Sequence, residues 1–349
     1  MENPASKAKK LAAARLRSQK RELDLATLVA GISGSDTGAL SKAITLIEST
    51  RPEDAQLASR IVEACLKKAG PGIRVGITGV PGVGKSTFIE TLGLKLISRG
   101  KRVAVLAVDP SSSLTKGSIL GDKTRMQQLS CAPEAFIRPS PAGDSLGGVA
   151  RKTREAITLC EAAGFDVILV ETVGVGQSEV AVNGMVDFFL LLKIAGAGDE
   201  LQGIKRGIME MADAVVINKA DGSNLPAAQK AQATFTRALH LYPPKANGWT
   251  PEVLLCSATE GTGIEEVWDL IAAYADRGRE DGSLERKRSA QNLDWLKQRI
   301  EYLLTSGFYQ DPEMRAAYEE MKRNVEQEQI SPFHAAGELH QMYLDRRNS

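Results

Sequence analysis

The chain has 349 residues, of which 43% are hydrophobic and 25% charged, enough for one sizeable α/β domain with helical additions. Its formal net charge of +1 gives no overall attraction to nucleic acid or to an anionic membrane surface, and no apolar run approaches the roughly 20 residues of a membrane-spanning helix. Four scattered cysteines and three histidines argue against structural zinc and a histidine-based metal site or triad, and they favour free thiols in a reducing compartment such as the cytoplasm.

Residues 1–70 predict a helical N-terminal extension. Its first 21 residues hold seven basic residues and one acidic residue, which weakly resembles a transit peptide to the mitochondrial matrix of a eukaryote, although a frayed basic helix is the simpler interpretation. Apolar residues then recur at helical spacing, and the stretch from Gly31 to Gly38 separates the first such segment from the second.

From residue 73 to about residue 283, short apolar runs alternate with helical segments. This pattern predicts an α/β domain over residues 71–283, with a mostly parallel central sheet covered by helices on both faces. The predicted strands are Ile73–Thr78, Val103–Val108, Val167–Val170, Phe188–Leu192, Ala214–Ile217 and Val253–Cys256. Ligands bind beyond the carboxyl ends of such strands, and each motif that follows lies at one of these ends.

A glycine-rich turn follows the first strand and precedes a helical pattern that begins at Lys85. The turn and the start of the helix read Gly79-Val80-Pro81-Gly82-Val83-Gly84-Lys85-Ser86-Thr87. Strand, glycine-rich turn and helix in this order predict a P-loop NTPase, because the backbone N–H groups and the helix N-terminus can surround a phosphate. Lys85 can neutralise the β- and γ-phosphates, and the Ser86 hydroxyl can hold Mg²⁺.

Two segments predict recognition of guanine. Asn218-Lys219-Ala220-Asp221 ends the run Ala214–Ile217, and the carboxylate of Asp221 can accept from N1–H and the exocyclic amine of guanine, whereas adenine offers an acceptor at N1. Ser257-Ala258-Thr259 follows the next run and can present backbone N–H groups to the base oxygen, or it can cap a helix. Both interpretations of this second segment stay open.

Further carboxylates predict the metal and catalytic residues. Glu171 in Glu171-Thr172-Val173-Gly174 can hold Mg²⁺, with a buried structural carboxylate as the alternative, and the Gly174 N–H can sense the γ-phosphate. Asp109 is a second Mg²⁺ candidate and Asp122 can orient the attacking water, with helix capping as the alternative for both. The predicted catalytic residues are Lys85, Asp109, Asp122 and Glu171, and the predicted metal ligands are Ser86, Asp109 and Glu171.

The position that would set the rate of hydrolysis departs from Ras-type proteins, which place a water-positioning glutamine directly after the glycine of the third motif. Here that position is Val175, and the nearest glutamine is Gln177. We therefore expect slow intrinsic GTP hydrolysis that a partner accelerates.

Residues 284–349 predict a helical arm with two apolar stripes, which either pack on their own core or form a dimer interface. The first stripe contains Leu293, Leu296, Ile300 and Leu303, and the second contains Met314, Tyr318, Met321 and Val325. Nearer the centre of the chain, two glycine clusters flank the charged stretch 196–207, which predicts either a loop that reorders with the bound nucleotide or a plain connection.

Over roughly residues 40–345 the chain resembles the MeaB/ArgK family of P-loop GTPases, also labelled LAO/AO transport kinases. The motifs that carry this resemblance are the P-loop, Ala107–Ser112, Ser118–Met126, Ile137–Pro141, Glu171–Glu179 and Gly198–Lys205. The chain departs from the family pattern at Lys116, at Lys193-Ile194-Ala195 and around Trp295, and the last two departures bear on partner identity and dimer geometry.

The resemblance implies a GTPase chaperone that gates adenosylcobalamin delivery to methylmalonyl-CoA mutase and protects or reactivates that enzyme. It also implies bound GTP or GDP with Mg²⁺, homodimers formed through the C-terminal helices, and a third switch loop in which Gln202 and Lys205 couple nucleotide state to the mutase. We expect no nucleic-acid or membrane partner.

Other functions remain open. The chain could serve another B12-dependent acyl-CoA mutase, or act as a P-loop kinase or ATPase linked to basic amino-acid transport, although no general base or acceptor pocket for a kinase can be named. A nickel-delivery GTPase would need clustered histidines or cysteines, and a cobalamin carrier would need a histidine in a cobalamin-ligand motif; neither is present.

Overall fold

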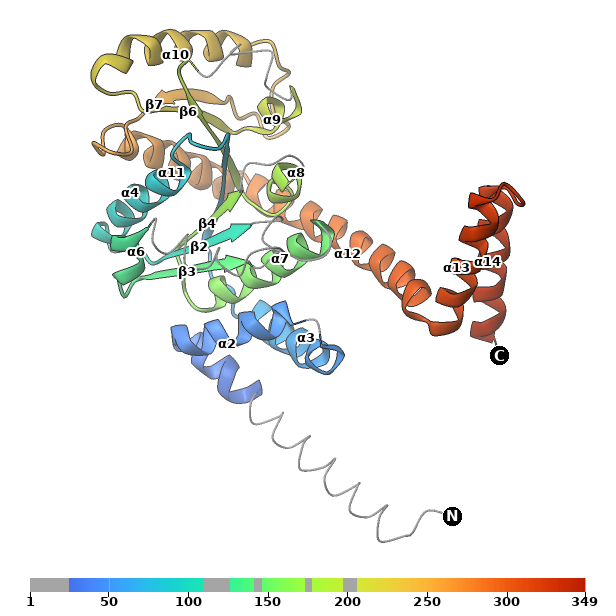
Figure 1. Cartoon of the computed structure of the whole chain (residues 1–349). Helices are drawn as coiled ribbons and strands as arrows, with labels where there is room; N and C mark the ends of the chain where they lie inside the picture. Colours follow the sequence, from blue (N-terminus) through green and yellow to red (C-terminus); the bar gives the residue numbers. More distant parts are fainter. Residues whose placement is uncertain are drawn as a thin grey trace. The chain divides into compact units, whose positions relative to one another are not determined.

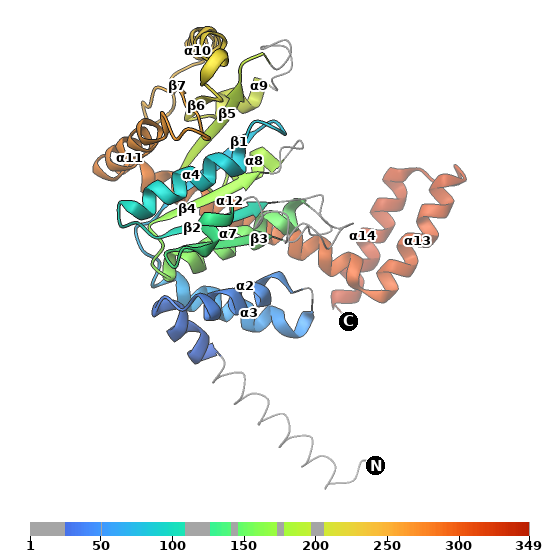
Figure 2. The ribbon, with the colours of Figure 1, turned by 60° about the vertical axis from the view of Figure 1, so that its left-hand side comes forward.

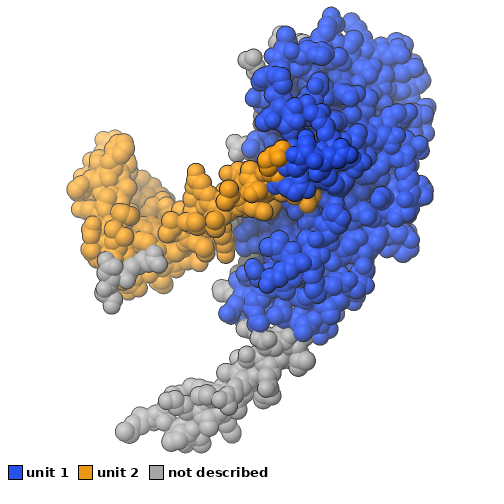
Figure 3. Space-filling view, turned by 180° about the vertical axis from the view of Figure 1, so that it is seen from behind, with its two compact units in different colours: residues 1–285 blue, residues 286–349 orange. Residues whose placement is uncertain are grey.

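The structure is a computed structural model that describes residues 25–49, 51–108, 126–140, 146–172, 178–196 and 206–348. The chain divides into two compact units, residues 1–285 and residues 286–349, which Figure 3 colours separately. The finer division into residues 1–70, 71–283 and 284–349 stays a prediction.

In the described part of the first unit, the centre is a seven-stranded parallel sheet with the order β3-β2-β4-β1-β5-β6-β7 (Figure 1). Its strands are β1 (Ile73–Gly79), β2 (Val103–Val108), β3 (Ala135–Ser140), β4 (Val167–Thr172), β5 (Phe188–Ile194), β6 (Ala214–Asn218) and β7 (Glu252–Leu255). Strands β1, β2, β4 and β6 are buried along their whole length, as expected for a sheet covered on both faces. The predicted α/β class is confirmed.

The sequence did not predict β3, which lies at one edge of the sheet. This strand contains Arg138 and Pro139 instead of a continuous apolar run. Because proline cannot donate to a ladder, sheets tolerate it mainly in edge strands, where one side needs no partner. Arg138 and Pro139 interrupt the apolar pattern, so the sequence does not predict the strand. The edge position explains why the sheet tolerates them.

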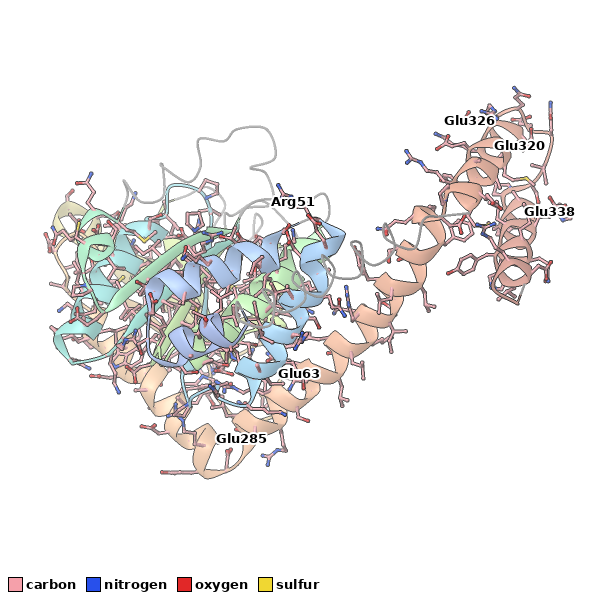
Figure 4. All side chains as sticks on the ribbon, turned by 90° about the horizontal axis from the view of Figure 1, so that it is seen from below. Arg51, Glu63, Glu285, Glu320, Glu326 and Glu338 are labelled. Atoms are coloured by element: carbon pink, nitrogen blue, oxygen red, sulfur yellow. The ribbon has the colours of Figure 1, made fainter. Side chains whose placement is uncertain are left out.

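Helices cover both faces of the sheet. They are α2 (Thr37–Glu48), α3 (Pro52–Leu66), α4 (Lys85–Ser98), α6 (Gln127–Cys131), α7 (Leu146–Ala162), α8 (Ser178–Asn183), α9 (Arg206–Met211), α10 (Leu225–Leu239) and α11 (Ile264–Glu280), with the short 3₁₀ turn η2 (Gly222–Asn224). Helices α4, α6 and α11 share one apolar cluster with the strands, and α9 and α10 share another (Figure 2). Helices α2 and α3 pack against each other and against α7 (Figure 4).

The predicted break between Gly31 and Gly38 is confirmed at its centre. Residues 25–33 are helical, a turn follows, and α2 begins at Thr37. The Asp36 carboxylate caps α2, since it accepts from the N–H groups of Gly38 at 2.7 Å and Ala39 at 3.2 Å.

A glycine in β1 lets a helix approach the sheet closely. A Cβ added at Gly76 would lie 2.9 Å from Cγ1 of Val182 and 3.0 Å from side-chain atoms of Val186 and Phe189. Val182 belongs to α8, which follows the strand end that carries Glu171. Helix α8 therefore rests directly on the β1 backbone.

A buried ion pair joins the start of β1 to α7. The guanidinium of Arg74 donates to both carboxylate oxygens of Glu161, at 2.7 and 2.8 Å, and the Glu161 side chain is only 2% exposed. The backbone N–H of Arg74 also donates to the Asp187 carboxylate at 2.9 Å. Removing one partner of such a pair leaves a buried charge without compensation.

We therefore expect Glu161→Gln to lower the free energy of unfolding by about 3 kcal/mol, measured from urea denaturation at neutral pH. Asp276→Asn is the matched control, because its exposed pair with Arg279 lies on the surface of α11 and should leave the midpoint close to wild type. Equal midpoints for the two variants would mean that the buried pair adds nothing to stability.

The second unit comprises most of α12 (Ser283–Gln310), with α13 (Pro312–Glu326) and α14 (Pro332–Asn348). Helices α13 and α14 pack side by side, where Glu320 and Glu338 mark them in Figure 4, and Met314, Ala335 and Leu339 are buried. Ser331 precedes α14, and its hydroxyl accepts from the His334 N–H of that helix at 3.2 Å. Met314 of the second stripe thus packs within this unit.

The first apolar stripe, by contrast, faces solvent along α12. Leu293, Leu296, Ile300 and Leu303 are 49–66% exposed. Among the described helices, none combines the length and apolarity needed to cross a lipid bilayer.

Candidate functional site

The glycine-rich turn leaves β1 at the edge where the carboxyl ends of the strands meet. Gly79, Gly82 and Gly84 all have positive φ, and α4 begins immediately afterwards at Lys85. A Cβ added at Gly84, whose φ is +92°, would lie 2.7 Å from the Asn218 side-chain nitrogen. The turn therefore needs glycine there both for its backbone conformation and for the close approach of another strand end.

Two side chains on the first turn of α4 point toward the loop and the neighbouring strand. The ammonium of Lys85, which is 8% exposed, donates to the Gly79 carbonyl at 2.9 Å and so lies inside the loop. The Ser86 hydroxyl donates to Oε1 of Glu171 at 3.2 Å. Parallel pairing of Ile77 with Glu171 places this carboxylate beside the strand that leads into the loop. The structure thus brings Lys85, Ser86 and Glu171 together.

The Ser86 and Glu171 oxygens fit a magnesium ion, which prefers hard oxygen ligands and usually takes one or two protein groups with phosphate oxygens and water. Within the described residues, no group of three or more histidine, cysteine, aspartate or glutamate side chains could hold a metal ion. Among the described residues, an ion at Ser86 and Glu171 would therefore find these two side chains, and its other ligands would be phosphate, water or residues outside the described ranges, such as the predicted ligand Asp109.

Side chains at the end of β6 connect the P-loop to the segment Ser257-Ala258-Thr259, which is predicted to contact the base. The Asn218 side-chain amide donates to the Val83 carbonyl at 2.8 Å and accepts from the Ala258 N–H at 3.1 Å. The ammonium of Lys219 donates to the Gly82 carbonyl at 2.9 Å. These three bonds make one continuous site from loops that lie far apart in the sequence.

Asp221 and Ser257 meet beyond the ends of β6 and β7. The Ser257 hydroxyl donates to Oδ2 of Asp221 at 2.5 Å and accepts from the Glu260 N–H at 3.2 Å. Helix α11 begins later, with Gly263 as its N-cap residue, so the helix-cap interpretation of the Ser257 segment is wrong for α11. Ser257 instead orients the carboxylate of Asp221, while Thr259 is exposed.

Five predicted site residues lie outside the described residues: Asp109, Asp122, Gly174, Gln202 and Lys205. Val175 and Gln177, which bear on the predicted rate, also lie outside them.

Three other contacts at the site have no signal in the sequence. The Thr91 hydroxyl on α4 donates to the Ala258 carbonyl at 2.7 Å, and the Thr172 hydroxyl donates to the Thr78 hydroxyl at 2.9 Å. Cys256 also contacts Oδ1 of Asn218 through its sulfur, and burial raises the pKa of this thiol to about 12, so it stays protonated at neutral pH. Threonine on a helix or strand is common, and only the folded arrangement gives these residues a role.

Asn218→Ala should weaken binding of GTP about tenfold or more, because it removes the side-chain bonds that join Val83 and Ala258. Isothermal titration with GTP and GDP measures this. Gln232→Ala, which removes a side-chain bond from α10 to the Val253 carbonyl, is the control and should bind like wild type. Wild-type affinity in Asn218→Ala would show that the two loops hold their positions without this amide.

Comparisons with known proteins give the family. The model of the family described as "Methylmalonyl Co-A mutase-associated GTPase MeaB" matches residues 40–313. A probable GTPase of Mycobacterium tuberculosis is 50% identical over 312 residues, which are 89% of this chain and 93% of that protein. GTPase ArgK of Escherichia coli is 44% identical over 311 residues, covering 89% and 94% of the two chains.

Two further relatives extend this similarity. The mouse protein named "methylmalonic aciduria type A homolog, mitochondrial" is 44% identical over 339 residues, covering 94% of this chain and 82% of its own. A solved structure named "LAO/AO transport system kinase" superposes with a TM-score of 0.73 at 37% identity, covering 93% and 98% of the two chains. These matches, together with the P-loop and the segment Asn218–Asp221, show that this chain belongs to the MeaB family of GTPases.

Proposed function

We propose that this chain hydrolyses GTP to GDP and phosphate and acts as a chaperone of methylmalonyl-CoA mutase. In this role it gates adenosylcobalamin delivery and protects or reactivates the mutase. The assignment of GTP binding and hydrolysis rests on one observation. Asn218 and Lys219 donate to the carbonyls of Val83 and Gly82, which joins the residues predicted to contact the base and those predicted to contact phosphate in one site. The family description and the name of the mouse relative support the proposed role with methylmalonyl-CoA mutase.

Asp221 selects guanine over adenine. Its carboxylate, held by Ser257, accepts from N1–H and the exocyclic amine of guanine. Adenine presents an acceptor at N1 and would leave this carboxylate facing a lone pair, at a cost of about 1–3 kcal/mol or more for a charged group. This preference weighs against an ATP-dependent kinase or ATPase of basic amino-acid transport, the function suggested by the name of the solved relative.

Hydrolysis proceeds by attack of water on the γ-phosphorus. Lys85 and the loop N–H groups stabilise the negative charge on the phosphates, and Asp122 orients the attacking water. Ser86, Glu171 and Asp109 would hold Mg²⁺, which would supply charge neutralisation to the phosphates. Since Val175 occupies the position of the water-positioning glutamine, hydrolysis without a partner is slow.

The partners act through two regions. Gln202 and Lys205 couple the nucleotide state to the mutase, or to a related B12-dependent acyl-CoA mutase. The exposed stripe on α12 joins two copies in a homodimer, because apolar side chains that are 49–66% exposed gain free energy when a partner covers them. This stripe contains Leu293, Leu296, Ile300 and Leu303. We place this activity in the cytoplasm, or in the mitochondrial matrix of a eukaryote.

GTP turnover by the purified protein, alone and with apo methylmalonyl-CoA mutase, tests the proposal. We expect slow turnover that the mutase accelerates, since the site lacks the water-positioning glutamine. Lys85→Ala should abolish turnover, and Asp221→Asn should shift the preference from GTP toward xanthosine triphosphate, whose 2-oxo group accepts a bond from the asparagine amide.

Each contrary outcome removes one part of the proposed function. Turnover that is indifferent to the mutase would keep the GTPase but remove this partner, and related acyl-CoA mutases would then be assayed. Fast single-turnover hydrolysis without any partner would contradict the expected slow rate, and a preference for ATP would remove the guanine assignment.

Leu296→Asp tests the dimer. Light scattering should give about twice the chain mass of 37.5 kDa for wild type and a mass near 37.5 kDa for the variant, because a buried carboxylate at the interface is costly. Leu241→Asp, which changes an 87%-exposed leucine outside α12, should remain dimeric. A monomeric wild type would refute the proposed dimer.

A further inference from the structure

Thr91 makes a long-range bond that an ordinary helical threonine does not need. It lies on α4, one turn after Thr87, and its Oγ1 is 2.7 Å from the Ala258 carbonyl oxygen and 3.0 Å from the Thr87 carbonyl oxygen. A hydroxyl has a single proton, and the shorter distance is to Ala258. Thr234 on α10 shows the ordinary pattern, a bond to the carbonyl four residues earlier at 3.0 Å.

The bond from Thr91 fixes the direction of one peptide in the loop Ser257-Ala258-Thr259, which we call the base loop. A trans peptide is planar, so its C=O and N–H point in opposite directions. Because the Ala258 carbonyl points to α4, the N–H of Thr259 in the same peptide points away from α4. The Ala258 N–H lies on the other side of this residue, where Asn218 accepts it at 3.1 Å.

The base loop is thus held from two directions. Asn218, at the end of β6, and Asp221, just beyond it, hold Ala258 and Ser257. Thr91 holds the Ala258 carbonyl from the helix that begins at the P-loop. Packing keeps Thr91 in reach, because Ala258 is 4% exposed and belongs to the same apolar cluster as Leu92 of α4 and Ile264 of α11. Lys95 and Arg99 also pair α4 with Glu265 and Asp269 of α11, at 2.9 and 3.0 Å.

We propose that Thr91 is a positioning residue for base specificity: its bond to the Ala258 carbonyl sets the peptide between Ala258 and Thr259 so that the backbone N–H of Thr259 faces the 6-oxygen of guanine. The proposal rests on the proposed GTP function and deepens it. Recognition of the base then has two separate parts, since Asp221 reads N1 and the 2-amino group while the loop that Thr91 orients reads position 6.

Two analogues separate these parts. In 6-thio-GTP, sulfur replaces the 6-oxygen and accepts hydrogen bonds more weakly, while inosine triphosphate lacks only the 2-amino group. Dissociation constants for GTP and both analogues are measured by titration for wild type, Thr91→Val, Thr91→Ser and Thr234→Val. Thr91→Val keeps the shape and removes the hydroxyl, Thr91→Ser restores it, and Thr234→Val removes a purely helical hydroxyl.

We expect Thr91→Val to weaken GTP binding about fivefold but 6-thio-GTP binding much less, so that the preference for GTP over 6-thio-GTP falls several-fold. The preference for GTP over inosine triphosphate should stay at the wild-type value, and Thr91→Ser and Thr234→Val should match wild type throughout. Thr91→Ala, measured alongside with its thermal unfolding, covers the case in which valine does not fit.

Equal weakening of all three nucleotides, or unchanged affinities in both Thr91→Val and Thr91→Ala, would overturn the proposal. In those cases wild type still prefers GTP, so the proposed GTPase function stands. A wild-type protein without preference for guanine nucleotides would overturn both.

Discussion

A single side-chain amide, that of Asn218, links the loop that surrounds phosphate to the loop that would meet the base. The side chain is almost fully buried, where an amide without hydrogen bonds is costly, so its partners Val83 and Ala258 must hold their relative positions. Strand β5 lies between β1 and β6, so the amide joins loops that follow strands one place apart in the sheet. The strand order sets how far apart the two loops lie, and the hydrogen bonds of the Asn218 amide join them into one site.

The parallel register explains why the phosphate side assembles as it does. Because β4 pairs with β1, the carboxylate of Glu171 ends its strand beside the strand that enters the P-loop, within hydrogen-bond distance of Ser86. The hydroxyls of Thr78 and Thr172 add a second link between the same two strands at the same level. Strand order and register, rather than sequence spacing, therefore bring together residues about 85 positions apart.

The sequence predicted the parts of the fold that repeat a strong local pattern. The run Val103–Val108 is continuous and apolar, and the observed strand has the same bounds, whereas β3 was missed because Arg138 and Pro139 interrupt its apolar character. Glycine, lysine and aspartate at fixed spacing pointed to the nucleotide motifs without any structure. The bond from Thr91 to Ala258 could not be predicted, because it joins residues 167 positions apart and a threonine hydroxyl in a helix usually bonds its own backbone.

The contact of α8 with the bare backbone at Gly76 has a consequence for how this sequence can vary. Every other amino acid carries a Cβ, and at this position that atom would press into Val182, Val186 and Phe189 within a densely packed interior. Any larger residue at position 76 would therefore force these three side chains to move, although the position touches no nucleotide motif. The volume of one methyl group thus separates a sheet that α8 can approach closely from one that holds it further away.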